Sequence, residues 1–118
     1  MPADGRPPSR RIAIWRDGEM LAETSGAVRV LEVGKDLYDP VLYLPPDDVT
    51  PRLRRRDVQS SHCPLKGDAV YFDLVDADGA VLVEKIAWSY PEPFPFASEL
   101  AGRIAFYARH VTIEEAPG

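Results

Sequence analysis

Apolar and polar residues alternate with a period of two along most of this chain, which is the pattern of β-strands rather than helices. Two short apolar runs, 12–15 and 20–24, flank Asp17-Gly18, the dipeptide typical of a two-residue hairpin turn. The pattern therefore predicts a first β-hairpin. Its expected core consists of two apolar cross-strand pairs, Ile14 with Leu21 and Trp15 with Met20.

Two more strands are expected at 28–31 and 41–44, separated by a loop that contains Gly and Pro. Thr50 and Pro51 then form a helix-start signal, as N-cap and first helical residue, and predict a single helical turn. Four arginines follow within 52–56. On a chain of net charge -5 they favour a solvated face over a phosphate-binding patch.

The strongest strand signals are the apolar runs 69–75 and 81–88, which the turn sequence DADG joins. We predict that they form one long hairpin, with a buried phenylalanine at position 72. The turn also predicts the register. The expected partners are Val75 with Ala80, Phe72 with Val83, Val70 with Lys85, and Gly67 with Trp88.

The C-terminal part predicts a short helix that begins near Pro95 and ends at Gly102, followed by one or two closing strands in 103–115. The total is about eight strands with one or two short helical turns. The predicted fold class is therefore mainly β, a small antiparallel sheet architecture.

Composition is consistent with one globular domain. A chain of 118 residues can bury one core, and 45% hydrophobic with 28% charged residues is ordinary for such a domain. The first residues are polar and rich in proline, and the last ones are expected to fray. The expected organisation is a flexible arm at 1–10, a single β-rich domain at 11–114 and a tail at 115–118.

Charge and cysteine content narrow the function classes. The net charge of -5 and the pI near 5.0 argue against general nucleic-acid binding. The N-terminal residues contain no apolar segment that would act as a secretory signal or membrane span. A single cysteine permits no intramolecular disulfide, so we expect a reducing, cytoplasmic location. Exposed strand edges are compatible with a monomer or a homodimer.

Two unusual segments meet at the open end of the predicted long hairpin, 61–69 (SHCPLKGDA) and 87–93 (AWSYPEP). Both are rich in Pro or Gly, yet they carry polar and aromatic side chains of the kind that form pockets. The leading hypothesis is a binding module that holds a small anionic or peptide-like ligand in a cleft between them. The candidate ligand-binding residues are His62, Cys63, Lys66, Trp88, Tyr90 and Glu92.

Four strings, YLPPDDV, HCPLKGDA, AWSYPEP and AGRIAFY, occur in an order and spacing that resemble the domain of unknown function 427 family. The resemblance runs from about Arg11 to Val111. It implies a small β-rich domain with a tent-like sheet arrangement, to which a barrel-like closure is the alternative, and a nucleotidyltransferase-like label sometimes accompanies the family. Leu65 departs from the pattern, since the family more often has an aromatic residue there.

Catalytic alternatives find less support in the residues. Cys63 is a conceivable nucleophile, but its neighbour His62 would point the opposite way along an extended chain. Nucleotidyl transfer needs clustered carboxylates, whereas the aspartates at 73, 76 and 78 surround a hairpin turn that itself favours Asp. No repeated spacing joins His110 to a second ligand, so we expect no metal and no cofactor. An enzyme that uses His62, Cys63 and Lys66 and a purely structural protein remain the two alternatives.

Overall fold

A computed structural model describes residues 10–30, 41–63 and 67–117, with the side chains of all of these except 10, 57–63, 96, 97 and 117. The described residues form nine strands and three short 3₁₀ helices. The strands are β1 (Arg10–Arg16), β2 (Glu19–Thr24), β3 (Val28–Val30), β4 (Val41–Tyr43), β5 (Leu53–Cys63), β6 (Gly67–Val75), β7 (Val81–Ser89), β8 (Ile104–Phe106) and β9 (Thr112–Pro117). The 3₁₀ helices are η1 (Pro46–Asp48), η2 (Pro95–Leu100) and η3 (Ala108–His110).

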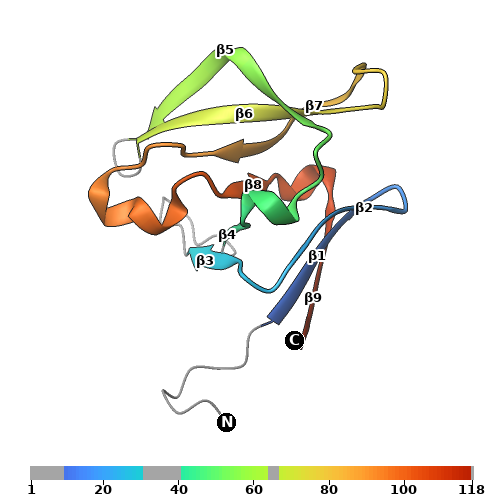
Figure 1. The fold of residues 1–118 in the computed structure, drawn as a ribbon, viewed down its shortest axis with the longest axis horizontal. Helices are drawn as coiled ribbons and strands as arrows, with labels where there is room; N and C mark the ends of the chain where they lie inside the picture. The colour runs from blue at the N-terminus through green and yellow to red at the C-terminus, as the bar shows by residue number, and fades with distance from the viewer. Residues whose placement is uncertain (1–9, 31–40, 64–66, 118) are drawn as a thin grey trace.

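The described strands pair in three antiparallel sheets, in the orders β2-β1-β9, β3-β4 and β5-β6-β7-β8. The mainly-β antiparallel fold class predicted from the sequence is therefore confirmed. Leu44 and Ile104 exchange two backbone hydrogen bonds of 2.8 Å each, which join β4 to β8. Through this bridge the second and third sheets continue into one another. In Figure 1, β5, β6 and β7 lie at the top, the β2-β1-β9 sheet lies at the lower right, and β4 and β8 lie between them.

Alternation of side chains gives the core two parts. One cluster includes Ile14 of β1, Leu74 of β6 and Phe106 of β8. It fills the space between the β2-β1-β9 sheet and the four-stranded β5-β6-β7-β8 sheet, called the large sheet below. A second cluster includes Tyr43 of β4 and Tyr90 next to β7, on the other face of the large sheet. Neighbouring residues of a strand point to opposite faces, so a strand such as β8 contributes to both clusters.

The first hairpin forms around Asp17 and Gly18, whose φ angles of 49° and 80° suit a two-residue turn. Trp15 pairs with Met20 as predicted, but a bulge after Ile14 pairs that residue with Ala22 instead of Leu21. Ile14 and Leu21 are buried, whereas Trp15 is half-buried and Met20 is 39% exposed. The expectation that both pairs lie in the core was wrong, because residues 14 and 15 point to opposite faces of the strand.

The long hairpin of β6 and β7 exists, but the predicted register was wrong. Leu74 pairs with Val83 and Phe72 with Ala87, so two steps along β6 face four steps along β7. The extra residues form a bulge that contains Lys85 at a φ of 50°. A turn cannot reveal a bulge further along the strand, so the sequence predicted an uninterrupted ladder. The observed partners are Val75 with Val81, Leu74 with Val83, Phe72 with Ala87, Tyr71 with Trp88 and Val70 with Ser89.

β5 bends near its middle, where Arg55 pairs with Phe72 and Ser60 with Val70. Five steps along β5 face two steps along β6, and the extra length forms the peak visible at the top of Figure 1. Phe72 lies between this bulge and the one in β7 and is half-buried, not buried as predicted. Paired bulges increase the local bend of a sheet, which gives this one its folded, tent-like form.

Two other local expectations concern short helices. After Pro51 the chain makes a turn and enters β5 directly, while the 3₁₀ helix lies earlier, at Pro46–Asp48. The predicted helix near Pro95 is present as the 3₁₀ helix η2, and Gly102 follows it at a φ of 70°. The β1–β9 pairing runs from Arg10, opposite Pro117, to Trp15, opposite Thr112.

The two unusual segments do meet, through backbone rather than through the predicted Gly67–Trp88 pair. Gly67 has a φ of 113°, and a Cβ built there would lie 3.3 Å from the Glu92 carbonyl oxygen and 3.4 Å from the Pro93 Cα. Only glycine combines this conformation with such an approach. Trp88 instead faces Tyr71, because of the bulge in β7.

We predict that Gly67→Ala lowers the free energy of unfolding by about 3 kcal/mol, since strain and a backbone clash act together. Gly18→Ala is the matched control, because Gly18 also has a positive φ of 80° but nothing lies within 4 Å of its built Cβ. That control should cost only about 1 kcal/mol. Urea denaturation measures both, and equal losses would contradict the close packing of the two segments.

Candidate functional site

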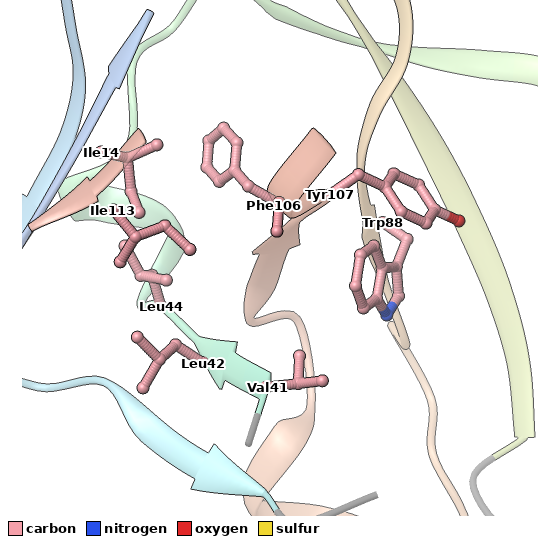
Figure 2. Close-up of a pocket in the computed structure, with 9 residues that line it drawn as sticks. Ile14, Val41, Leu42, Leu44, Trp88, Phe106, Tyr107 and Ile113 are labelled. Carbon is pink, nitrogen blue, oxygen red and sulfur yellow. The ribbon is translucent and has the colours of Figure 1, made fainter. Parts of the chain in front are cut away.

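A cavity of about 160 Å³ lies where the three sheets meet. Figure 2 shows aliphatic side chains on one side of it, and Phe106, Tyr107 and Trp88 on the other. Every lining side chain is aliphatic or aromatic. The residues are Ile14 of β1, Val41 and Leu42 of β4, Leu44, Trp88 of β7, Phe106 of β8, Tyr107, Ala108 of η3, and Ile113 of β9.

The cavity lies beside the bridge that joins β4 to β8. The reciprocal hydrogen bonds between Leu44 and Ile104 hold the strands together at this point. In an antiparallel pair the next residues to face each other in this way would be Leu42 and Phe106. Both residues line the cavity, and no bridge joins them within the described residues. The cavity therefore lies beside this bridge and is lined by residues of both strands.

Trp88 forms the aromatic wall of this gap and is held from two sides. Its ring meets Tyr43 edge-on at 6.2 Å between centroids, and its Nε1 donates a long hydrogen bond of 3.4 Å to the Tyr43 hydroxyl. On the other side the Tyr107 ring lies at 4.4 Å. Tyr43 is fully buried, so Trp88 is packed on a rigid support.

Two cations lie over aromatic rings at this point, one over Tyr107 in the cavity wall and one over its neighbour Tyr71. The Arg109 guanidinium lies 4.6 Å from the centre of the Tyr107 ring, and the Lys85 ammonium lies 5.0 Å from that of Tyr71. Burial, and then the charge and hydrogen bond of the neighbouring Tyr71 side chain, raise the pKa of Tyr107, although Arg109 acts in the opposite direction. The Tyr107 phenol therefore stays protonated at neutral pH.

The structure brings one of the six predicted ligand-binding residues, Trp88, into the wall of the cavity. Tyr90 is buried in the second core cluster, 6.4 Å from Tyr43 between ring centroids, and does not line the cavity. Glu92 is exposed, with its carbonyl oxygen near Gly67.

The backbone of His62 and Cys63 continues β5, opposite Asp68 and Gly67. Their side chains, and all of Lys66, lie outside the described residues. Ligand binding or catalysis by these three residues stays a prediction.

Sequence reasoning missed most of the cavity wall. Phe106 and Tyr107 belong to the AGRIAFY string, so a signal was present, but apolar residues in a strand pattern predict core rather than a cavity. Val41 and Ile113 come from strands that lie far apart in the sequence. Their approach depends on how the sheets pack, which no local pattern contains.

The profile of the domain of unknown function (DUF427) matches residues 4–116. The chain belongs to the DUF427 family. This confirms the resemblance drawn from the four strings in the sequence. No match to a curated protein was found.

In this DUF427 domain, the carboxylates of Asp73 and Asp76 accept hydrogen bonds from backbone N–H groups. The Asp76 carboxylate accepts hydrogen bonds from the N–H groups of Asp78 and Ala80 and so shapes the turn before β7. The Asp73 carboxylate accepts from Arg56 at 2.8 Å and from the Lys85 N–H at 3.0 Å. These contacts support the structural interpretation of the turn aspartates over a nucleotidyl-transfer site.

Two further observations concern metals and membranes. Among the described residues, no group of three or more His, Cys, Asp or Glu side chains has a geometry that could hold a metal ion. No helix in the described ranges has the length and apolar character needed to cross a membrane.

His110 Nε2 accepts a 3.3 Å hydrogen bond from Arg109, and burial, together with Arg109 and Arg16, lowers the pKa of His110.

The arginines after Pro51 act mainly as structural cations. Arg52 pairs with Glu19, and Arg54 donates to the Gly79 carbonyl at 2.9 Å. Arg56 is bound to Asp73, whose side chain is 12% exposed. A shared surface patch would leave these groups available for a partner, whereas here three of the four have intramolecular partners.

Asp73 gives the domain a defined acid sensitivity. Desolvation alone would raise its pKa, but the Lys85 N–H and the Arg56 guanidinium outweigh this and lower the pKa below its ordinary value. A depressed pKa stabilises the fold at every pH above the unfolded value of about 3.9, and this contribution is lost as the pH falls through the folded pKa.

We predict that Asp73→Asn lowers the free energy of unfolding by about 2 kcal/mol at pH 7, because Arg56 loses its charged partner. Below about pH 4 the difference from the parent should shrink as Asp73 is protonated. Urea denaturation at pH 7 and pH 3 measures this. The exposed Asp78, changed to Asn, is the control and should cost less than about 0.5 kcal/mol. A loss from Asp73→Asn that does not change with pH would contradict the assigned interaction.

Proposed function

We propose that this DUF427 domain is a binding module that holds a small apolar group in the cavity at the junction of its sheets. The observation that carries the proposal is the lining, which combines residues from β1, β4, β7, β8, η3 and β9 without a single charged side chain. A concave, mostly apolar site with an aromatic wall is typical of small-molecule binding.

The size of the cavity defines the size of the group. An apolar protein cavity of about 150 Å³ holds one benzene ring. At about 160 Å³, this cavity is of the same size. The ligand part that enters it is therefore about one aromatic ring, or a branched aliphatic group of similar volume.

The same lining favours binding over catalysis at this position. General acid–base chemistry needs a side chain that changes its protonation state near neutral pH. Tyr107 is the one lining residue with an ionisable side chain, and its pKa is raised further from neutrality. The ligand expected from the sequence was anionic or peptide-like, but an apolar wall penalises a charged group. A neutral group is what this cavity supports.

The rigid support of Trp88 adds to the proposal. Tyr43 fixes the indole by edge contact and hydrogen bond, and Tyr107 packs against it. A wall that is already ordered loses little entropy when a ligand binds, which favours affinity from a small contact area.

Toluene, which brings one ring and no polar group, is the probe that tests the proposal. We predict saturable chemical-shift changes in an NMR titration, concentrated on the methyl groups of Val41, Leu44 and Ile113. Ile113→Trp should fill the cavity and weaken toluene binding at least tenfold. Ile113 is 40% exposed on β9, so the larger side chain can be accommodated without a buried clash.

Val81→Trp is the matched control, since Val81 is also a β-strand residue, 44% exposed, and does not line the cavity. This variant should bind toluene as the parent does. The proposal fails if toluene shifts no lining methyl group, or if both tryptophan variants bind it equally well.

A further inference from the structure

Arg109 places a cation at the border of the cavity. The residue follows Ala108 of η3, and both Tyr107 and Ala108 line the cavity. The Arg109 guanidinium lies 4.6 Å from the centre of the Tyr107 ring. In Figure 2 this ring lies beside Trp88 in the aromatic wall. A single ring therefore borders the apolar cavity and supports a positive charge.

The guanidinium of Arg109 is held from two sides. The Tyr107 ring attracts the cation through its π electrons. Arg109 Nε donates its 3.3 Å hydrogen bond to Nε2 of His110, whose lowered pKa keeps that ring neutral and able to accept at pH 7. A guanidinium bound through Nε keeps its two terminal NH₂ groups, the pair that can bind a carboxylate with two parallel hydrogen bonds.

Arg109 lacks the anionic partner that most described arginines have. Those that form an ion pair with a carboxylate are Arg11, Arg16, Arg29, Arg52 and Arg56. Arg54 and Arg103 donate to backbone carbonyls. No ion pair between described residues includes Arg109, and the residue is exposed. Arg109 is thus oriented and accessible to an anion from solution.

The charges beside η3 favour a negatively charged group. Arg16 donates a hydrogen bond of 2.7 Å to the His110 carbonyl, so a second guanidinium lies next to the same helix. The carboxylate of Asp17 lies 3.9 Å from Arg16, but its side chain is 89% exposed, so water and salt screen it. This end of the cavity is therefore locally positive on a chain whose net charge is -5.

We infer that the ligand of this cavity carries a carboxylate beside its ring-sized apolar group, and that Arg109 binds this carboxylate. The apolar group enters the cavity, where a charge would be penalised. The carboxylate stays at the exposed border and accepts two hydrogen bonds from the terminal NH₂ groups of Arg109. The ligand class is a small aryl or branched aliphatic carboxylic acid in its ionised form. This inference rests on the proposed function, since it names the chemical class of ligand for the same site.

Two probes of the same shape test the inference by NMR titration, with toluene as the ring alone. They are hydrocinnamate, in which a flexible two-carbon linker joins a phenyl ring to a carboxylate, and its uncharged amide, hydrocinnamamide. The carboxylate is the more strongly hydrated, so a cavity without a cationic partner would bind the amide more tightly. We expect hydrocinnamate to bind about fivefold more tightly than the amide, the upper value for an exposed ion pair.

Substitutions at two exposed arginines assign this preference to one residue. The preference is the ratio of the two dissociation constants within one variant, so a general loss of stability cancels. It should disappear in Arg109→Gln. Arg109→Lys keeps the charge without the planar fork and should retain part of it. Arg55→Gln is the matched control and should retain all of it, since Arg55 is also exposed, forms no ion pair with a described residue and does not line the cavity.

Two further measurements locate the two parts of the ligand. Sodium chloride at about 1 M should reduce the preference for the carboxylate, because it screens exposed charges. Ile113→Trp, which fills the cavity, should weaken hydrocinnamate and hydrocinnamamide by the same factor, because both place the same ring there.

The outcomes distinguish this inference from the proposed function. If toluene binds but hydrocinnamate binds no more tightly than its amide, or if Arg109→Gln and Arg55→Gln reduce the preference equally, the carboxylate inference is overturned and the binding cavity stands. Hydrocinnamate binding that Ile113→Trp leaves unchanged also overturns it, because the anion then binds without the cavity. If toluene and both probes fail to bind, both proposals are overturned.

Discussion

The exchange of two backbone hydrogen bonds between Leu44 and Ile104 is the interaction on which the rest of this structure depends. It joins β4 to the edge of the large sheet and so brings Tyr43 under Trp88, where the second core cluster forms. The cavity lies beside this bridge, and Leu44 itself is part of its lining. This one bridge thus both closes the core and borders the cavity.

Bulges on both sides of β6 provide the curvature that makes this arrangement possible. The bulge in β7 is stabilised by Asp73, whose carboxylate accepts the Lys85 N–H and binds Arg56. A buried carboxylate in a small acidic domain is costly unless it has such partners. The Asp73 carboxylate thus fixes backbone geometry, and the bulge in turn places Trp88 opposite Tyr71, within reach of Tyr43.

The two parts of the core have different consequences for function. The aliphatic cluster around Ile14 and Phe106 fills the space between sheets, as in an ordinary sandwich. The aromatic cluster around Tyr43 and Trp88 leaves a ring-sized volume beside it. Large planar side chains cannot fill irregular gaps as completely as methyl groups can, so the cavity lies at the border between the two clusters.

The sequence by itself determined the strand pattern, the turn at Asp17-Gly18, the turn role of Asp76 and membership in the DUF427 family, because each depends on residues close together in the chain. It also singled out Trp88, which lines the cavity, since a tryptophan beside prolines and polar residues is a local signal. Tertiary structure alone decided the register of β6 and β7, the bridge between Leu44 and Ile104 and the approach of Ile113 to Val41. Bulges and sheet packing are set by contacts between distant residues, and alternation along one strand carries no information about them.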